Sequence, residues 1–195
     1  MIDHGFKQNF VGFTFAFYRL ANRIYWKHKE IPEIWHERSR KIQVHIPSNH
    51  SVLEFGAGKG LLKAISENSI YLATDLILRP GIDLIIDLNK PFHLEHKYDT
   101  SVLLGILEYL DSPFNSLERV SKYTSHNIIL TYCFPCDGFK KYTRRRLMWV
   151  NDLTESNLIS IFKDLGFKIL SSELIEKTSN YRQYIWVLVR KDPLK

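Results

Sequence analysis

The sequence predicts an α/β fold with a mostly parallel sheet, and three observations support this prediction. Short apolar runs alternate with amphipathic stretches over most of the chain, as in strand–helix–strand units. A glycine-rich turn, Gly56 to Gly60, follows the first apolar run. The second and third runs each end on an acid, Asp75 and Asp87. A length of 195 residues suits one such domain with a substantial core.

The first half of the α/β region predicts four strands and one helix. Val52–Phe55 is a short apolar run stopped by glycines, which is typical of a buried strand. A helix is expected from Leu61 to Asn68. Three further strands are expected over residues 70–75, 82–87 and 100–105.

The second half continues the alternation and closes with a hairpin. Ser112-Pro113 suits the cap and first position of a helix that runs to about Tyr123. A strand is expected over residues 127–134, and Thr154 caps a second helix that Gly166 ends. The two final strands are expected over residues 167–175 and 184–190.

Residues 1–47 differ from the rest and are expected to form an N-terminal helical cap on a domain of residues 48–195. Aromatic residues there alternate with Lys and Arg, so we expect two or three helices that end near Pro47. The simpler interpretation is packing on the core. The alternative is an aromatic and basic surface, including Phe10 to Tyr18, that lies on a membrane or grips a substrate.

The glycine turn and the acids around it predict a nucleoside-binding site at the carboxyl ends of the strands. A dinucleotide site needs G-x-G-x-x-G, whereas the third glycine of Gly56-Ala57-Gly58-Lys59-Gly60 comes one position early. Glu54 stands two positions before the glycines, where a carboxylate can reach a ligand ammonium. Asp75 is placed to accept both ribose hydroxyls, and Asp87 to bind an exocyclic adenine amine.

Together these motifs resemble those of the class I S-adenosylmethionine methyltransferases, in the small-molecule branch called methyltransferase type 11. The resemblance covers about residues 48–190, and Leu103–Leu110 is similar to the branch's fourth-strand motif. It implies a Rossmann-like three-layer sandwich with a seven-stranded sheet, whose last strand is antiparallel. It also implies S-adenosylmethionine as cofactor, bound by Glu54, Gly56, Ala57, Gly58, Asp75, Leu76, Asp87, Leu88 and Gly105.

Catalytic residues are harder to predict. Candidates at the ends of the fourth and fifth strands are Glu108, Tyr109, Asp111 and Tyr132, and Tyr109 is favoured as the residue that faces the acceptor. Some quinone-pathway relatives bind a metal through acids and a histidine in the fourth-strand motif. Because Gly105 and Tyr109 replace two of those ligands here, no metal is expected.

Two further groups of residues carry weaker signals. Cys133 and Cys136 form a C-x-x-C, but no helix start or second ligand pair accompanies them, so they are expected to be loop thiols. Lys140 to Arg146 is the most basic run and is expected to be a loop. It is either a solvated surface or a border of the acceptor pocket that recognises an anionic or sugar-linked small molecule.

The sequence therefore predicts a methyltransferase that O-methylates a small-molecule or glycan-like acceptor. The alternatives are an RNA- or protein-directed methyltransferase, which the net charge of +6 would suit, and a non-catalytic binding protein that contacts a membrane through its N-terminal segment. A cytoplasmic location is expected, because cysteines are sparse and neither a signal peptide nor a spanning stretch is evident. The oligomeric state is not predicted.

Overall fold

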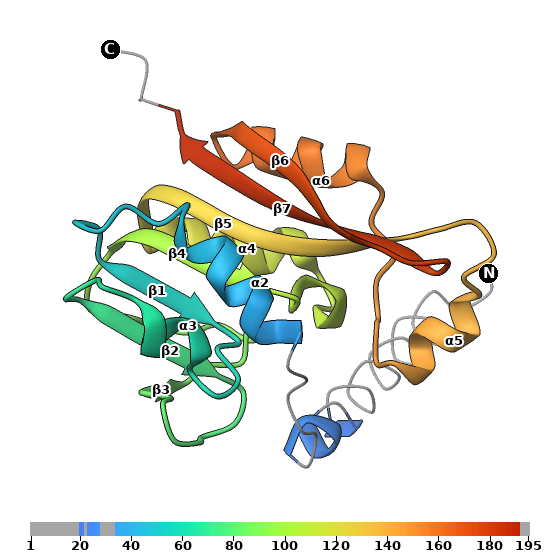
Figure 1. Ribbon diagram of the computed structural model, residues 1–195, viewed down its shortest axis with the longest axis horizontal. Helices are drawn as coiled ribbons and strands as arrows, with labels where there is room; N and C mark the ends of the chain where they lie inside the picture. The colour runs from blue at the N-terminus through green and yellow to red at the C-terminus, as the bar shows by residue number, and fades with distance from the viewer. Residues whose placement is uncertain (1–19, 22, 28–33, 192–195) are drawn as a thin grey trace, which may run out of the picture.

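The computed structural model describes residues 20–21, 23–27 and 34–191, and these form a single seven-stranded sheet covered by helices on both faces (Figure 1). The strand order is β3-β2-β1-β4-β5-β7-β6. β7 alone runs antiparallel to its neighbours, β5 and β6, so the predicted topology is confirmed. The strands are β1 (Val52–Phe55), β2 (Tyr71–Asp75), β3 (Leu84–Ile85), β4 (Tyr98–Leu104), β5 (Thr124–Pro135), β6 (Phe167–Lys177) and β7 (Tyr181–Arg190).

Two helices pack on each face of the sheet. Alternate residues of a strand point to opposite faces, and β5 follows this rule with Ile128 and Leu130 on one face and Ile129 on the other. The first face is covered by α4 and α6, and the second by α2 and α3. The helices are α2 (Ile34–Gln43), α3 (Leu61–Ile65), α4 (Pro113–Lys122), α5 (Lys141–Arg146), α6 (Glu155–Asp164) and the 3-10 helix η1 (Leu107–Tyr109).

The predicted caps are present. Ser112 accepts a hydrogen bond from the Asn115 amide at the start of α4, and Thr154 and Asn157 form a reciprocal capping box at the start of α6. Gly166 follows α6 with a φ of 76°. These local signals mark both helix starts because each satisfies backbone amides that the first turn leaves without a partner.

Several predicted bounds were wrong. The helix expected to reach Asn68 ends at Ile65, because Ser66 is extended and the Asn68 side chain donates to the carbonyls of Pro47, Ser48 and His50. The third strand is only Leu84–Ile85, at the edge of the sheet. The basic run is not a loop: Lys141–Arg146 is helix α5.

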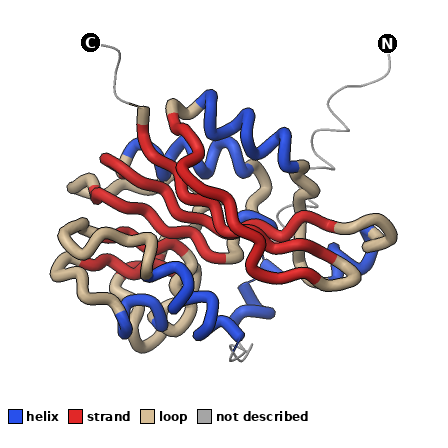
Figure 2. The backbone as a smooth tube through the Cα atoms, turned by 45° about the horizontal axis from the view of Figure 1, so that its top comes forward, coloured by secondary structure: helices blue, strands red, loops and turns tan. Residues whose placement is uncertain are grey.

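β5, β7 and β6 continue past the end of β4 as a three-stranded ribbon (Figure 2). The last residue of β4, Leu104, pairs with Thr131. Beyond this point residues 132–135 of β5 pair only with residues 181–184 of β7. Residues 182–184 pair in turn with β6, whose residues 174–177 include a register shift between Leu174 and Glu176. We call these twelve positions the projecting ribbon.

Part of the N-terminal segment is helical, as expected. Residues 20–21 and 23–27 are helical, and α2 packs on the core through Ile42. Phe10 to Tyr18, the segment considered for membrane contact, lies outside the described residues. Within the described ranges, no helix is long and apolar enough to cross a membrane.

Candidate functional site

The glycine turn packs tightly against the loop after β4. Gly56 has a φ of 68°, and a Cβ atom at this position would lie 2.3 Å from Ile106 Cγ2. Only glycine therefore fits, for both conformational and steric reasons. The Ala57 amide donates to the Thr74 carbonyl at 2.9 Å, which fixes the turn against β2.

Asp75, the last residue of β2, is bound to the same turn. Its Oδ2 accepts a hydrogen bond from the Gly58 amide at 2.9 Å, and its Oδ1 accepts one from the Ile77 amide at 3.0 Å. Burial raises the pKa of Asp75, and the two amide hydrogen bonds oppose the shift. Each carboxylate oxygen keeps a second lone pair, so the side chain can still accept hydrogen bonds from a ligand.

A first pocket opens beside this turn, at the carboxyl ends of β1, β2 and β4. It brings together most of the predicted cofactor residues and Tyr109. The predicted residues that line it are Gly56, Gly58, Asp75, Leu76, Asp87, Leu88, Gly105 and Tyr109. Its other lining residues, which sequence reasoning missed, are Trp26, Phe55, Arg79, Ile86, Asn89, Leu104, Ile106 and Leu110. Adjacency to Asp87-Leu88 could have indicated Ile86 and Asn89. Trp26 belongs to the aromatic N-terminal segment, for which a surface that grips a substrate was one interpretation.

Glu54 and Ala57 are the two predicted cofactor residues that do not line the first pocket. Glu54 is only 3% exposed, and its Oε2 accepts a hydrogen bond from the Tyr71 hydroxyl at 2.8 Å. Burial raises the pKa of Glu54 to about 7, although Tyr71 and Arg38 oppose the shift. Ala57 is buried against Ala73 and Ile82. Both side chains are therefore buried next to the glycine turn and do not face the first pocket.

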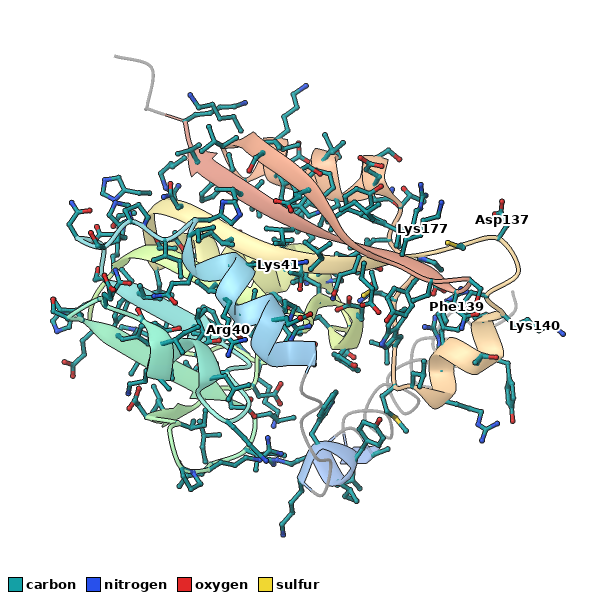
Figure 3. All side chains as sticks on the ribbon, in the orientation of Figure 1. Arg40, Lys41, Asp137, Phe139, Lys140 and Lys177 are labelled. Carbon is teal, nitrogen blue, oxygen red and sulfur yellow. The ribbon has the colours of Figure 1, made fainter. Side chains whose placement is uncertain are left out.

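A second pocket adjoins the first and shares Trp26, Gly105 and Tyr109 with it. Its far wall is the projecting ribbon, through Cys133, Ile175, Glu176, Tyr181 and Gln183. The remaining lining residues are Tyr25, Glu37, Arg38, Lys41, Glu108, Leu147 and Trp149. Lys41, one of these residues, is labelled on α2 in Figure 3.

Arg38 lines the second pocket beside Gly105, a residue that both pockets share. A Cβ atom on Gly105, whose φ is 64°, would lie 2.7 Å from Arg38 Nη1. Arg38 Nη2 donates to the Leu104 carbonyl at 3.4 Å. Its positive charge lowers the pKa of Glu54 and of Glu108, so Arg38 stabilises the ionised forms of two buried carboxyl groups.

Glu108, on η1, is a buried carboxylate that lines the second pocket. It is 2% exposed, and its Oε1 accepts a hydrogen bond from the Cys133 amide at 2.8 Å. Its Oε2 has no hydrogen-bond partner among the residues that the structure describes. Burial raises the pKa of Glu108, while the Cys133 amide and Arg38 lower it.

Tyr109, the favoured catalytic residue, lies in the wall between the pockets. Its hydroxyl accepts a hydrogen bond from Trp149 Nε1 at 3.3 Å, and its ring packs edge-on against Trp26 at 5.4 Å. Burial and the neighbouring Glu108 raise the pKa of Tyr109, so its phenol stays protonated at neutral pH. That Tyr109 faces the acceptor stays a prediction. Its protonated phenol is poorly suited to act as a base.

The other two candidates for the base line neither pocket. The Tyr132 hydroxyl donates to Asn151 Oδ1 and accepts from the Leu153 amide, both at 2.9 Å, which ties β5 to the segment before α6. The Asp111 amide donates to Asn89 Oδ1 at 2.8 Å. These contacts indicate structural roles.

Cys133 is not a loop thiol, contrary to expectation. It lies in β5, is 6% exposed, and its thiol has a pKa raised by burial and by Glu108. Cys136 comes directly after the strand and is partly exposed, and both cysteines are free. A thiol kept protonated in this way is a weak nucleophile.

The basic run does not itself line the second pocket. Residues 140–146 are absent from the pocket lining, whereas Leu147 and Trp149, directly after α5, belong to it. Arg144 Nε and Arg145 Nη2 both pair with Asp152, at 2.8 and 3.0 Å. Among the described residues, no group of three His, Cys, Asp or Glu side chains could hold a metal ion.

Comparisons with known proteins support the fold. Neither a protein-family model nor a curated protein matches the chain. Among solved structures, it is similar to magnesium protoporphyrin IX methyltransferase from Synechocystis PCC 6803 with bound S-adenosylhomocysteine, at 17% identity and a TM-score of 0.60 over 92% of this chain and 94% of that one.

Two further solved structures are similar at the same level. One is 1,6-didemethyltoxoflavin-N1-methyltransferase from Burkholderia thailandensis, at 16% identity and a TM-score of 0.64 over 98% and 92% of the two chains. The other is the N-methyltransferase NodS from Bradyrhizobium japonicum WM9, at 13% identity and a TM-score of 0.62 over 86% and 92%. Both were crystallised with S-adenosylhomocysteine. The chain therefore has the class I methyltransferase fold, as its motifs predicted.

Proposed function

We propose that this chain is an S-adenosylmethionine-dependent methyltransferase that acts on a small-molecule acceptor. The observation that supports the proposal is the joining of two pockets. The first collects the glycine turn, Asp75 and Asp87, and the second adjoins it through Trp26, Gly105 and Tyr109. The methyl donor and the methyl acceptor would meet at the wall that the two pockets share.

The first pocket has the backbone and carboxylate groups that S-adenosylmethionine needs for binding. Gly56 and Gly58 present backbone without side chains, Asp75 offers carboxylate oxygens to the ribose, and Asp87 offers them to the adenine amine. Bound there, the cofactor would supply a methyl group already activated on a sulfonium sulfur. The chain's own residues would then act by orienting the acceptor and excluding water.

The RNA-directed alternative has less support. Arg144 and Arg145, the centre of the basic run, both pair with Asp152, so their charges are partly neutralised within the protein. No residue of the sequence specifies the oxygen atom of the predicted acceptor, and the side chains of the second pocket favour a different atom. The cytoplasmic location remains part of the proposal.

Calorimetric titration with S-adenosylmethionine and S-adenosylhomocysteine tests the proposal. Wild type should bind both, and Asp75→Ala should lose at least about 100-fold in affinity, because hydrogen bonds to a carboxylate contribute about 1.5–3 kcal/mol each.

Asp83→Ala is the matched control. Asp83 also accepts a backbone hydrogen bond, from the Ala73 amide at 2.7 Å, but it does not line the first pocket. Its replacement should leave cofactor affinity within about threefold of wild type. If folded wild type binds neither ligand, the proposal is wrong.

A further inference from the structure

The second pocket has aromatic walls. Five of its lining residues carry Tyr or Trp rings: Tyr25, Trp26, Tyr109, Trp149 and Tyr181. They are braced edge-on against one another, with Trp149 and Tyr181 at 5.8 Å and Tyr25 and Trp26 at 5.1 Å between ring centroids. Such walls favour a flat apolar group, and the faces of the rings also favour a cation.

Among the residues that the structure describes, the lining of this pocket carries more carboxylates than cations, although the molecule as a whole is basic. The chain carries a net charge of +6. Its described lining residues, however, include three carboxylates (Glu37, Glu108 and Glu176) and two cations (Arg38 and Lys41). A lining with more carboxylates than cations, in a basic protein, disfavours an anionic acceptor and favours a cationic one.

Glu108, which lines this pocket, carries a buried carboxylate oxygen that lacks a hydrogen-bond donor within the part of the chain that the structure describes. Glu108 Oε1 is satisfied by the Cys133 amide, while the buried Oε2 has no hydrogen-bond partner among the described residues. Buried polar atoms are rarely left without a partner, so each exception needs a physical reason. An N–H group of a bound acceptor would supply the missing hydrogen bond.

From these three features we propose that the acceptor is an arylalkyl amine, whose ring lies against the aromatic walls and whose nitrogen is bound and deprotonated by Glu108. This inference rests on the proposed function and specifies its acceptor. It replaces the oxygen atom predicted from the sequence with nitrogen, and Tyr109 as the catalytic residue with Glu108.

The reaction balances with Glu108 as the base. An acceptor that enters as an ammonium gives one N–H proton to Oε2, which leaves a lone pair on nitrogen. That pair forms the N–C bond with the methyl carbon, the C–S bond breaks, and its electrons stay on sulfur. The product leaves as a methylated ammonium, and the proton on Glu108 passes to solvent. Burial raises the pKa of Glu108, which makes it a stronger base than an exposed carboxylate.

Calorimetry on the protein saturated with S-adenosylhomocysteine tests this inference without any turnover. The probes are tryptamine, tryptophol, in which a hydroxyl replaces the amine, and indole-3-acetate, in which a carboxylate does. We expect tryptamine to bind at least about tenfold more tightly than tryptophol, and indole-3-acetate to bind most weakly.

Glu108→Gln should abolish the preference for tryptamine over tryptophol. Glutamine keeps an oxygen for the Cys133 amide, so the fold should survive, and S-adenosylhomocysteine affinity should stay within about twofold. Glu173→Gln is the matched control, because Glu173 is an exposed glutamate of β6 that lines neither pocket, and its replacement should leave the preference unchanged.

The outcomes separate the two proposals. If S-adenosylhomocysteine binds but the amine is not preferred, or no probe binds, or Glu108→Gln keeps the preference, the amine inference is overturned and the methyltransferase proposal stands. If S-adenosylhomocysteine itself does not bind to folded protein, the proposed function fails, and the amine inference fails with it.

Discussion

Glu54 is a buried carboxyl group whose protonation is linked to the stability of the fold. Its pKa is raised from 4.5 to about 7, chiefly by burial, and the groups that influence it are Tyr71, Arg38, Asp75 and Lys63. The folded state therefore binds a proton more tightly than the unfolded state. Stability contributed by this group is complete below about pH 4.5 and falls as the pH rises toward 7.

This linkage predicts a pH dependence that one substitution removes. Between pH 5 and 8, wild type should lose about 2–3 kcal/mol more free energy of unfolding than Glu54→Gln, since one pKa unit corresponds to about 1.4 kcal/mol. Urea denaturation at several pH values measures the difference. Asp83→Asn is the control, because the pKa of Asp83 is lowered and its titration lies below this range. Parallel curves for wild type and Glu54→Gln would contradict the prediction.

For single residues, the sequence predicted positions in the site correctly where a motif fixes the course of the backbone. Gly56, Gly58, Asp75 and Asp87 meet in one pocket because a glycine turn and strand ends place them there in any such sheet. The position of Glu54 did not reveal that its carboxylate faces Tyr71 instead of the pocket. Side-chain direction depends on tertiary neighbours, which a motif does not specify.

Among the elements, α2 depends on a glycine in another part of the chain. Arg38 of α2 passes over Gly105, at the end of β4, and reaches the Leu104 carbonyl. A side chain at position 105 would displace the guanidinium from the two carboxylates that it stabilises. The absence of a side chain at Gly105 thus leaves the space through which Arg38 of α2 reaches the end of β4.

Gly105→Ala should therefore cost about 2–3 kcal/mol of stability, part from its φ of 64° and part from the contact at 2.7 Å. Gly138→Ala separates the two contributions. Gly138 has a φ of 89° but nothing within 4 Å of a Cβ atom, so its replacement should cost only about 1 kcal/mol. Chemical denaturation measures both. In an Arg38→Met background the two costs should become similar, and equal costs in wild type would refute the steric role of Arg38.

The elements that were predicted correctly have local signals, and those that were missed do not. The capping groups of α4 and α6 are readable because they lie next to the helices they start. α5 carries no apolar stripe and no side-chain cap, and is held instead by the pairing of Arg144 and Arg145 with Asp152. The lengths of β5, β6 and β7 arise from mutual pairing, so no single segment specifies them.

On the scale of the whole molecule, the proposed cofactor should raise thermal stability by mass action. A ligand at 100 times its Kd that binds only the folded state adds about 2.7 kcal/mol. For a chain of 195 residues this corresponds to a Tm increase of roughly 5–10 °C. Thermal unfolding with and without S-adenosylhomocysteine measures the increase. Asp75→Ala should lose it at the same ligand concentration, and an equal increase in that variant would place the ligand elsewhere.

The fold as a whole was predictable because strand–helix alternation and a glycine turn leave few topologies open. The acceptor was not predictable. Its pocket is made by residues from the N-terminal helical segment, η1, the segment after α5 and the projecting ribbon, which only the folded chain brings together.

The first pocket and the projecting ribbon come from different parts of the sequence. Every residue that lines the first pocket precedes residue 111, while the ribbon wall of the second pocket comes entirely from residues after 132. A recombination point between these stretches would replace the ribbon wall of the second pocket and leave the first pocket and Glu108 intact. Chimaeras of this fold with a different carboxyl-terminal third would thus change the ribbon wall against which an acceptor lies, while the residues of the first pocket stay the same.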